Sequence, residues 1–220
     1  MSKSILDQVR QWIPGGATKV AVLTTTGMSD AALSVAADLA IDVLTHRSAD
    51  EAIDSGYDLL ILADEAEDVA SLTLIAAYTR NDAAAVMPVL DDDNEWMRIA
   101  GNVRDGMRPI RNELTEHQRT LAIDPTGTIA AMHHVLTTAA NRGVRVLING
   151  TGACAAALVA DRTSHQMSKH WMLADATTHA GILAAMARLD RPALATFDIN
   201  DSHLAALLAV PIVRAASLTS

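Results

Sequence analysis

The sequence predicts a three-layer α/β fold, in which a mostly parallel, Rossmann-like sheet is flanked by helices on both faces. Short aliphatic runs end in polar or turn residues, as strands that are covered on both faces do. Helical patterns lie between these runs. Strand, helix and strand in that order imply right-handed crossovers, and therefore a parallel sheet.

Five aliphatic runs are the predicted strands. They are KVAVLTTTG at 19–27, DLLILADE at 58–65, AAVMPVLDDD at 84–93, VRVLING at 144–150 and PALATFDIN at 192–200. We expect residues 58–62, 144–148 and 193–197 to form neighbouring parallel strands. The loops after them should share one edge of the sheet, because ligands of such sheets bind at the carboxyl ends of the strands.

The remaining segments carry helical patterns. Residues 1–16 form an amphipathic pattern that ends in Pro-Gly-Gly, and residues 91–121 form two helical patterns without a strand between them, which predicts a helical excursion over one sheet edge. The clearest helix is TGTIAAMHHVLTTAANRG, in which Thr126 can cap the start and Gly143 can end the helix just before a strand.

Composition limits the partners and the compartment. The chain has 220 residues, which suits one domain over residues 1–220, and it is 50% hydrophobic but only 3% aromatic, so the core is aliphatic. Its net charge of −9 repels phosphate backbones and anionic lipids, so we expect neither nucleic acid nor membrane as partner. The lone Cys154 excludes an intrachain disulfide and favours a reducing, cytoplasmic setting. The sequence predicts no metal site and no cofactor.

The stretch VRVLINGTGACAAALVADR raises the question of a phosphate site. Gly150, Gly152 and Ala155 match G-x-G-x-x-A at the junction of a strand and a helix, where free backbone N–H groups can hold a phosphate. In a dinucleotide-binding fold this motif follows the first strand, whereas here only one strand signal follows it. The favoured interpretation is a tight turn that lets an alanine-rich helix pack closely on the sheet. A nucleotide-binding module that uses Gly150 and Gly152 is the alternative.

Three segments together resemble one enzyme family. The segment DPTGTIAAMHHVLTTAANRGVRVLINGTGACAAALVA resembles the central part of the nicotinate-nucleotide:dimethylbenzimidazole phosphoribosyltransferases, which make the α-ribazole phosphate of the cobalamin lower loop. RPALATFDINDSHLAALLAVPIVRAA is similar to the closing segment of the family, and SADEAIDSGYDLLILADEAEDVASLTLIAAY to the segment that carries its glycine-rich phosphate loop. The resemblance implies the Rossmann-like fold, a symmetric homodimer and a divergent member shortened at its N-terminus.

The resemblance also locates the expected site and its losses. It places Ser202, which cannot act as a base, where the family has its general-base glutamate, with Asp201 one position earlier. At the phosphate-side loop, glycines are replaced and carboxylates crowd a helix start, where they repel a phosphate; these are Asp64, Glu65, Glu67 and Asp68. Of the family's phosphate-binding run, SHQMSKHWMLADATTH keeps only the outer elements, Ser164-His165 and His179.

We therefore expect a catalytically degenerate homologue that binds a small aromatic base or a nucleotide-like ligand, or acts as a partner protein, in cobalamin lower-ligand metabolism. An active transferase with a relocated carboxylate, Asp201 or Asp64, is a second hypothesis. The candidate ligand-binding residues are Asn149, Gly150, Gly152, Glu65, His179 and Ser202.

Overall fold

The computed structural model describes residues 4–25, 27–45, 47–63, 68–110, 120–197 and 199–218. In this part of the chain the strands form one sheet of order β2-β1-β3-β4-β5-β6, and every neighbouring pair is parallel. The strands are β1 Val20–Thr24, β2 Asp42–Thr45, β3 Leu59–Leu62, β4 Arg145–Ile148, β5 Trp171–Asp175 and β6 Ala193–Ala195. The α/β prediction with a parallel sheet is confirmed.

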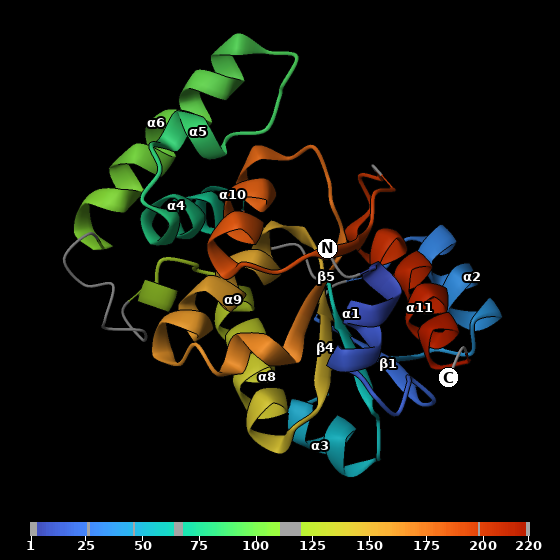
Figure 1. Ribbon diagram of the computed structural model, residues 1–220. Helices are drawn as coiled ribbons and strands as arrows, with labels where there is room; N and C mark the ends of the chain where they lie inside the picture. The colour runs from blue at the N-terminus through green and yellow to red at the C-terminus, as the bar shows by residue number, and fades with distance from the viewer. Residues whose placement is uncertain are drawn as a thin grey trace.

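Helices cover both faces of the sheet (Figure 1). The described helices are α1 Ile5–Trp12, α2 Asp30–Asp38, α3 Ala49–Asp54, α4 Asp68–Thr79, α5 Ala83–Val86, α6 Asp93–Ile110, α8 Thr128–Arg142, α9 Gly150–Thr163, α10 Ala180–Leu189 and α11 Ser202–Leu218, with a 3₁₀ turn, η1, at Met167–His170. None of the described helices has the length and apolarity that a membrane crossing requires.

Alternation along each strand divides the core into two layers. In β3, Leu60 and Leu62 face a core built with α3, α4, α8, α9 and α10, whereas Leu59 and Ile61 face a second core built with α1, α2 and α11. All four side chains are buried, at no more than 2% exposure. The continuous hydrophobicity of the predicted strands is therefore the signature of a sheet that is covered twice.

The helices change face where the strand order reverses. The chain moves outward from β1 to β2 through α2 on the second core, and it then crosses to β3 through α3 on the first core. From β3 to β6 it advances in one direction, with the connecting helices on the first core. A right-handed crossover requires this change of face when the direction reverses, so the topological switch point lies between β1 and β3.

The alanine-rich helix α9 is the centre of the first core. Every residue from Gly152 to Asp161 is buried, and α9 packs against α4, α8 and α10. Small side chains allow these close helix contacts. Helix α4 lies between α9 and α6, so α6 forms an outer layer (Figure 1). Residues 93–110 form a helix as predicted, but this helix packs on α4 and not over a sheet edge; residues 111–119 lie outside the described residues.

The strand prediction at 84–93 is wrong. Residues 83–86 form the short helix α5, and the chain continues to residue 92 without a strand. Pro88 lacks a backbone N–H and cannot complete a central ladder, so the run is not a strand. Two of its apolar residues, Val86 and Met87, are instead buried in the first core, whereas Val89 is exposed.

Two strands were not predicted. β2 is a short edge strand whose residues are exposed or half-buried, so it carries no continuous aliphatic run. β5 is fully buried, but it begins with Trp171 and Met172 and not with a run of branched aliphatic residues. Residues 58–62 and 144–148 do pair in parallel, but the expected adjacency of 193–197 to 144–148 is wrong, because β5 lies between β4 and β6. Two strands follow Gly150 where only one was expected.

The helix caps also differ in detail from their prediction. Gly143 ends α8 in the left-handed conformation, φ 75°, as predicted. The N-cap of α8 is Gly127 rather than Thr126, and Asp124 accepts the Ile129 N–H at 2.8 Å. Thr126 still contributes, because its hydroxyl accepts the Thr128 N–H at 3.2 Å.

Candidate functional site

A cavity opens where β4, β5 and β6 end. We name it the β4–β6 cavity; its volume is about 370 Å³, within the range of small-molecule sites. Its lining residues come from the loops after these strands, from the starts of three helices and from the segment after α5. They are Pro88, Val89, Asn149, Gly150, Thr151, Asp175, Thr177, Thr178, His179, Ile182, Ile199, Asn200 and Ser202. Four predicted ligand-binding residues, Asn149, Gly150, His179 and Ser202, thus meet at one cavity.

Gly150 allows the turn after β4 to approach helix α11. Its φ of +84° lies in the left-handed region, where a side chain is strained. A Cβ built on Gly150 would lie 3.3 Å from Ser202 Cβ and 3.9 Å from the Ala63 carbonyl oxygen. The glycine is therefore explained by backbone conformation and close packing, without a bound phosphate.

Hydrogen bonds fix this junction. The Ser202 hydroxyl donates to the Ala63 carbonyl at 2.7 Å, and Asn149 Nδ2 donates to the Ser202 carbonyl at 3.0 Å. The Asn149 N–H donates to the Leu62 carbonyl at 3.1 Å. These bonds join the ends of β3 and β4 to the start of α11. They also commit the Ser202 hydroxyl hydrogen to a structural contact.

Asp175, at the end of β5, is a site residue that sequence reasoning missed. Its side chain is buried, and Oδ1 accepts the Phe197 N–H at 2.6 Å. Oδ2 has no hydrogen-bond partner, and neither has Oδ1 of the buried Asn149. A carboxylate that closes a buried strand was the signal that could have revealed Asp175, had WMLAD been recognised as a strand.

His179 caps helix α10 at the cavity. Its Nδ1 accepts the Gly181 N–H at 3.1 Å, so the hydrogen of the neutral ring is on Nε2. The Thr177 hydroxyl accepts the His179 N–H at 3.2 Å. A Cβ on Gly181 would lie 2.9 Å from the Val86 carbonyl oxygen, so this turn also packs closely.

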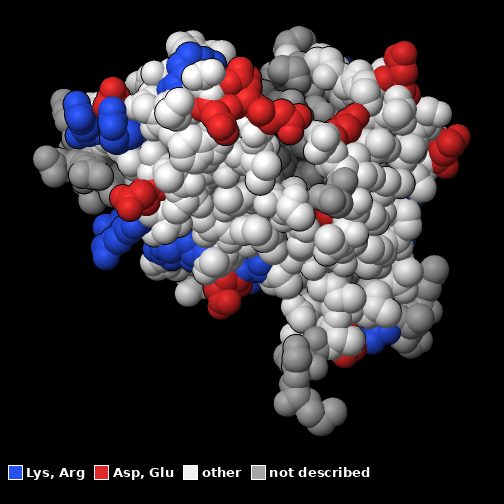
Figure 2. All heavy atoms as spheres, turned by 90° about the horizontal axis from the view of Figure 1, so that it is seen from above, with Lys and Arg blue, Asp and Glu red and all other residues white. Residues whose placement is uncertain are grey.

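The electrostatics of the cavity combine helix ends with one carboxylate. Helices α9, α10 and α11 all begin at its lining, and their N-terminal N–H groups and dipoles are positive. No Lys or Arg is among the lining residues that the structure describes, and Asp175 is the charged one. Seen from above, the molecule has uncharged side chains over much of its middle, with Lys and Arg mainly to one side (Figure 2).

Asp201 and Gly152 do not line the cavity. Asp201 caps α11, where Oδ1 accepts the Leu204 N–H at 2.9 Å and Oδ2 accepts the Ser29 hydroxyl at 2.5 Å. Burial raises the pKa of Asp201, whereas the hydrogen bond from Ser29, the backbone N–H groups and the charge of His203 lower it. The lowering effects are larger in sum, so the pKa of Asp201 lies below its usual value. Gly152 is buried within the first turn of α9.

Two further candidates, Asp64 and Glu65, lie outside the described residues, as does Glu67. Asp68 begins helix α4. In the described residues no group of three or more His, Cys, Asp or Glu side chains is placed to hold a metal ion.

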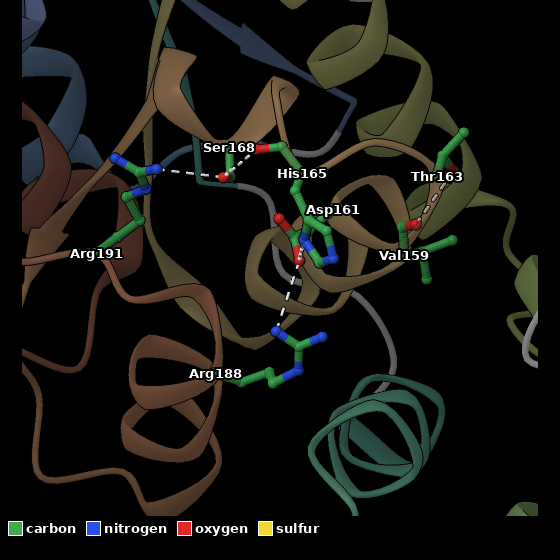
Figure 3. Close-up of polar contacts among 7 residues, drawn as sticks. All are labelled: Val159, Asp161, Thr163, His165, Ser168, Arg188 and Arg191. Carbon is green, nitrogen blue, oxygen red and sulfur yellow. Dashed lines mark hydrogen bonds and ion pairs between the residues drawn. The ribbon is translucent and has the colours of Figure 1, made fainter.

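Ser164 is the C-cap of α9 and His165 follows it, whereas the β4–β6 cavity lies at the start of this helix. Figure 3 shows His165 beside Asp161. His165 Nδ1 contacts Asp161 Oδ2 at 2.9 Å, and Arg188 reaches the same oxygen at 3.7 Å. In the sequence, strand β5 lies between Ser164-His165 and His179. The outer elements of the expected phosphate-binding run are therefore not brought together.

A second, smaller cavity lies at the topological switch point. Its volume is about 120 Å³, and Thr25, Ser48 and Leu62 are among its lining residues. It is below the size of ordinary small-molecule sites, about 300–1,000 Å³. The β4–β6 cavity is therefore the stronger candidate.

The fold and the site together define a doubly wound α/β protein with a ligand-sized cavity at the carboxyl edge of its parallel sheet. A sequence profile of a family described as Phosphoribosyltransferase matches residues 7–219. The chain belongs to this family, as a divergent member, and the resemblance deduced from its sequence is confirmed.

Curated relatives carry the name nicotinate-nucleotide:dimethylbenzimidazole phosphoribosyltransferase. The Streptomyces coelicolor protein is 33% identical over 177 residues, which are 77% of this chain and 49% of the relative. The Streptomyces avermitilis protein is 31% identical over 95% of this chain and 56% of its own length. The chain thus spans about half the length of the curated relatives it matches.

A solved structure agrees with the fold. The crystal structure of nicotinate-nucleotide-dimethylbenzimidazole phosphoribosyltransferase from Thermus thermophilus matches with a TM-score of 0.75 at 14% identity. The match covers 99% of this chain and 95% of the Thermus chain. At this identity the likeness establishes the shared α/β architecture.

Proposed function

We propose that this chain binds a small aromatic base or a nucleotide-like ligand in the β4–β6 cavity, as a family member that has lost phosphoribosyl transfer. The observation that carries the proposal is the meeting of Asn149, Gly150, His179 and Ser202, from different loops, at one cavity. The names of the relatives contain a nicotinate nucleotide and dimethylbenzimidazole, which are a nucleotide and a small aromatic base. The corresponding process is the formation of the cobalamin lower-ligand nucleotide.

The loss of phosphoribosyl transfer is supported by the hydrogen bonds of Ser202 and Asp201, the residues at and next to the position of the family's general base. A general base must lie within hydrogen-bond reach of the proton that it removes. The Ser202 hydroxyl donates to Ala63, and both oxygens of Asp201 accept hydrogen bonds outside the cavity lining. Neither residue is placed to take a proton from a nucleophile in the cavity.

An active transferase with a relocated carboxylate is the second candidate. The observation that favours it is Asp175, whose Oδ2 is without a partner and whose side chain lines the cavity. In this case the unprotonated ring nitrogen of the base attacks, nicotinate leaves, and Asp175 would accept the proton from the other ring nitrogen, in place of Asp201 or Asp64. Turnover separates the two candidates.

The first experiment is a calorimetric titration with nicotinate mononucleotide, dimethylbenzimidazole, α-ribazole phosphate and NAD. Thr151→Trp should fill the cavity and abolish binding, because Thr151 lines it at the start of α9. Met97→Trp is the matched control, since Met97 is 59% exposed and does not line this cavity. Equal binding by both variants, or no binding by the wild type, contradicts the proposal.

The second experiment follows nicotinate release by chromatography, with nicotinate mononucleotide and dimethylbenzimidazole as substrates. We expect no release above the protein-free control. Release that Asp175→Asn abolishes would establish the second candidate. Release that Asp201→Asn abolishes would show that Asp201 reaches the substrate despite its capping role.

Two further properties complete the proposal. A homodimer is supported by the family resemblance and by exposed apolar side chains such as Val89, 96% exposed, and Met97. A cytoplasmic location is supported by the lone Cys154, which is buried and without a disulfide partner in the sequence.

A further inference from the structure

Two residues that line the β4–β6 cavity, Asn149 and Asp175, each have a buried side-chain oxygen with no hydrogen-bond partner. Asn149 is 4% exposed and Asp175 is 1% exposed, yet Asn149 Oδ1 and Asp175 Oδ2 have no partner. Both residues line the β4–β6 cavity, and they close the neighbouring strands β4 and β5. Buried polar groups in native proteins are almost always paired, so two unpaired acceptors on residues of one cavity point to a role in accepting hydrogen bonds from a ligand.

The remaining hydrogen bonds fix the chemistry of this pair. Asn149 Nδ2 donates to the Ser202 carbonyl, which leaves the amide oxygen as the unpaired atom. Asp175 Oδ1 accepts the Phe197 N–H, which leaves Oδ2. Both free atoms are acceptors. A complementary ligand must therefore bring two hydrogen-bond donors to them.

The charge of the cavity acts against a phosphate. The positive ends of α9, α10 and α11 could attract an anion, but the Asp175 carboxylate already lies among them. The described lining contains no Lys or Arg that could offset a second negative charge. A phosphate dianion would meet Asp175 as a like charge in a partly desolvated site.

We propose that the β4–β6 cavity selects a ribonucleoside over its 5′-phosphate. The two adjacent hydroxyls of the ribose donate to Asn149 Oδ1 and Asp175 Oδ2, as acidic side chains near strand ends bind ribose hydroxyls in dinucleotide folds. The inference rests on the proposed function, and it specifies the ligand class of the same site. It assigns Asp175 the role of a specificity residue that rejects phosphate.

The test in the wild-type protein is a calorimetric comparison of three probes: α-ribazole, α-ribazole 5′-phosphate and dimethylbenzimidazole. We expect α-ribazole to bind roughly 10- to 100-fold more tightly than its phosphate, because the phosphate is repelled. The difference should shrink as salt is raised. The free base should bind more weakly than α-ribazole, because it has no ribose hydroxyls.

One substitution and its control test whether Asp175 causes the preference for α-ribazole over its phosphate. Asp175→Asn keeps an Oδ1 acceptor for the Phe197 N–H, removes the charge, and should lower α-ribazole affinity about tenfold while narrowing the gap to the phosphate. Asp105→Asn changes the net charge equally at an exposed site on α6, and it should leave all three affinities unchanged. Circular dichroism verifies that each variant is folded.

The outcomes separate the inference from the proposed function. If the phosphate binds as tightly as α-ribazole or more tightly, the selectivity is refuted while ligand binding stands. If the free base binds as tightly as α-ribazole, the ribose contact is refuted. If none of the probes binds, or if Thr151→Trp leaves binding unchanged, the proposed function fails and this inference fails with it. The wild-type comparison holds even if Asp175→Asn does not fold.

Discussion

Replacement of Gly150 by alanine tests why a glycine follows β4. Gly150 has a φ of +84°, and its missing Cβ leaves room for Ser202 at the start of α11. The Ser202 hydroxyl is held on the Ala63 carbonyl at 2.7 Å, so it cannot move away without losing that bond. Gly150→Ala should therefore strain the backbone and push on a fixed neighbour at the same time.

The expected cost has two parts. A non-glycine residue in the left-handed region costs about 1–2 kcal/mol. The new Cβ would lie 3.3 Å from Ser202 Cβ, and relief of this close contact weakens a buried hydrogen bond that contributes about 1 kcal/mol. We therefore expect Gly150→Ala to destabilise the fold by about 2–3 kcal/mol.

Gly143→Ala is the matched control. Gly143 has a similar φ of +75°, but nothing lies within 4 Å of its Cβ position. Its substitution should cost only the conformational part, about 1–2 kcal/mol. Urea unfolding monitored by circular dichroism gives both values, provided that the m-value is unchanged. Equal destabilisation by the two substitutions would refute the packing explanation, as would a Gly150→Ala variant that is as stable as the wild type.

Three further predictions concern other parts of the chain. Burial and the charges of Arg145 and Lys169 lower the pKa of His170 to about 4 from its ordinary 6.5. The folded state therefore favours the neutral ring. The stability that His170 contributes above pH 6.5 should be lost as the pH falls toward 4. The free energy of unfolding should fall by about 1 kcal/mol after allowance for solvent screening. Urea unfolding midpoints at pH 7 and pH 5 measure this loss. An equal loss in the His170→Gln variant would contradict its assignment to His170. Burial raises the pKa of the Cys154 thiol to about 12, so iodoacetamide should label Cys154 only in denaturant, and rapid labelling of the native protein would contradict its burial. Light scattering should return the mass of a dimer at micromolar concentration, and a monomer mass would contradict the proposed homodimer.

Much of the fold follows from local pattern. The strands β1, β3 and β4 are short aliphatic runs that are buried on both faces, and β6 is a shorter, partly buried run; such runs are visible in a single sequence. β2 is not visible because an edge strand buries little, and the run at 84–93 is misleading because Pro88 prevents pairing. Which face a helix covers depends on the strand order, which no local pattern contains.

The site was predictable where its residues adjoin predicted elements. Asn149 and Gly150 follow a recognised strand, and Ser202 came from the family resemblance, so their convergence needed only the parallel sheet. Asp175 was missed together with β5. The contact of Gly150 with Ser202 joins residues that lie far apart in the sequence, and the unpaired state of Asn149 Oδ1 depends on the whole fold. Neither could be deduced from composition or spacing.

Ligand binding at the β4–β6 cavity is the central claim, and mapping of backbone amide shifts by ¹⁵N NMR during a titration with α-ribazole tests it most directly. The claim predicts that the shifts concentrate on amides around the cavity, including Gly150, Thr151 and Gly181. Shifts confined to the smaller cavity at the switch point, around Thr25 and Ser48, would contradict it, as would a spectrum that α-ribazole leaves unchanged.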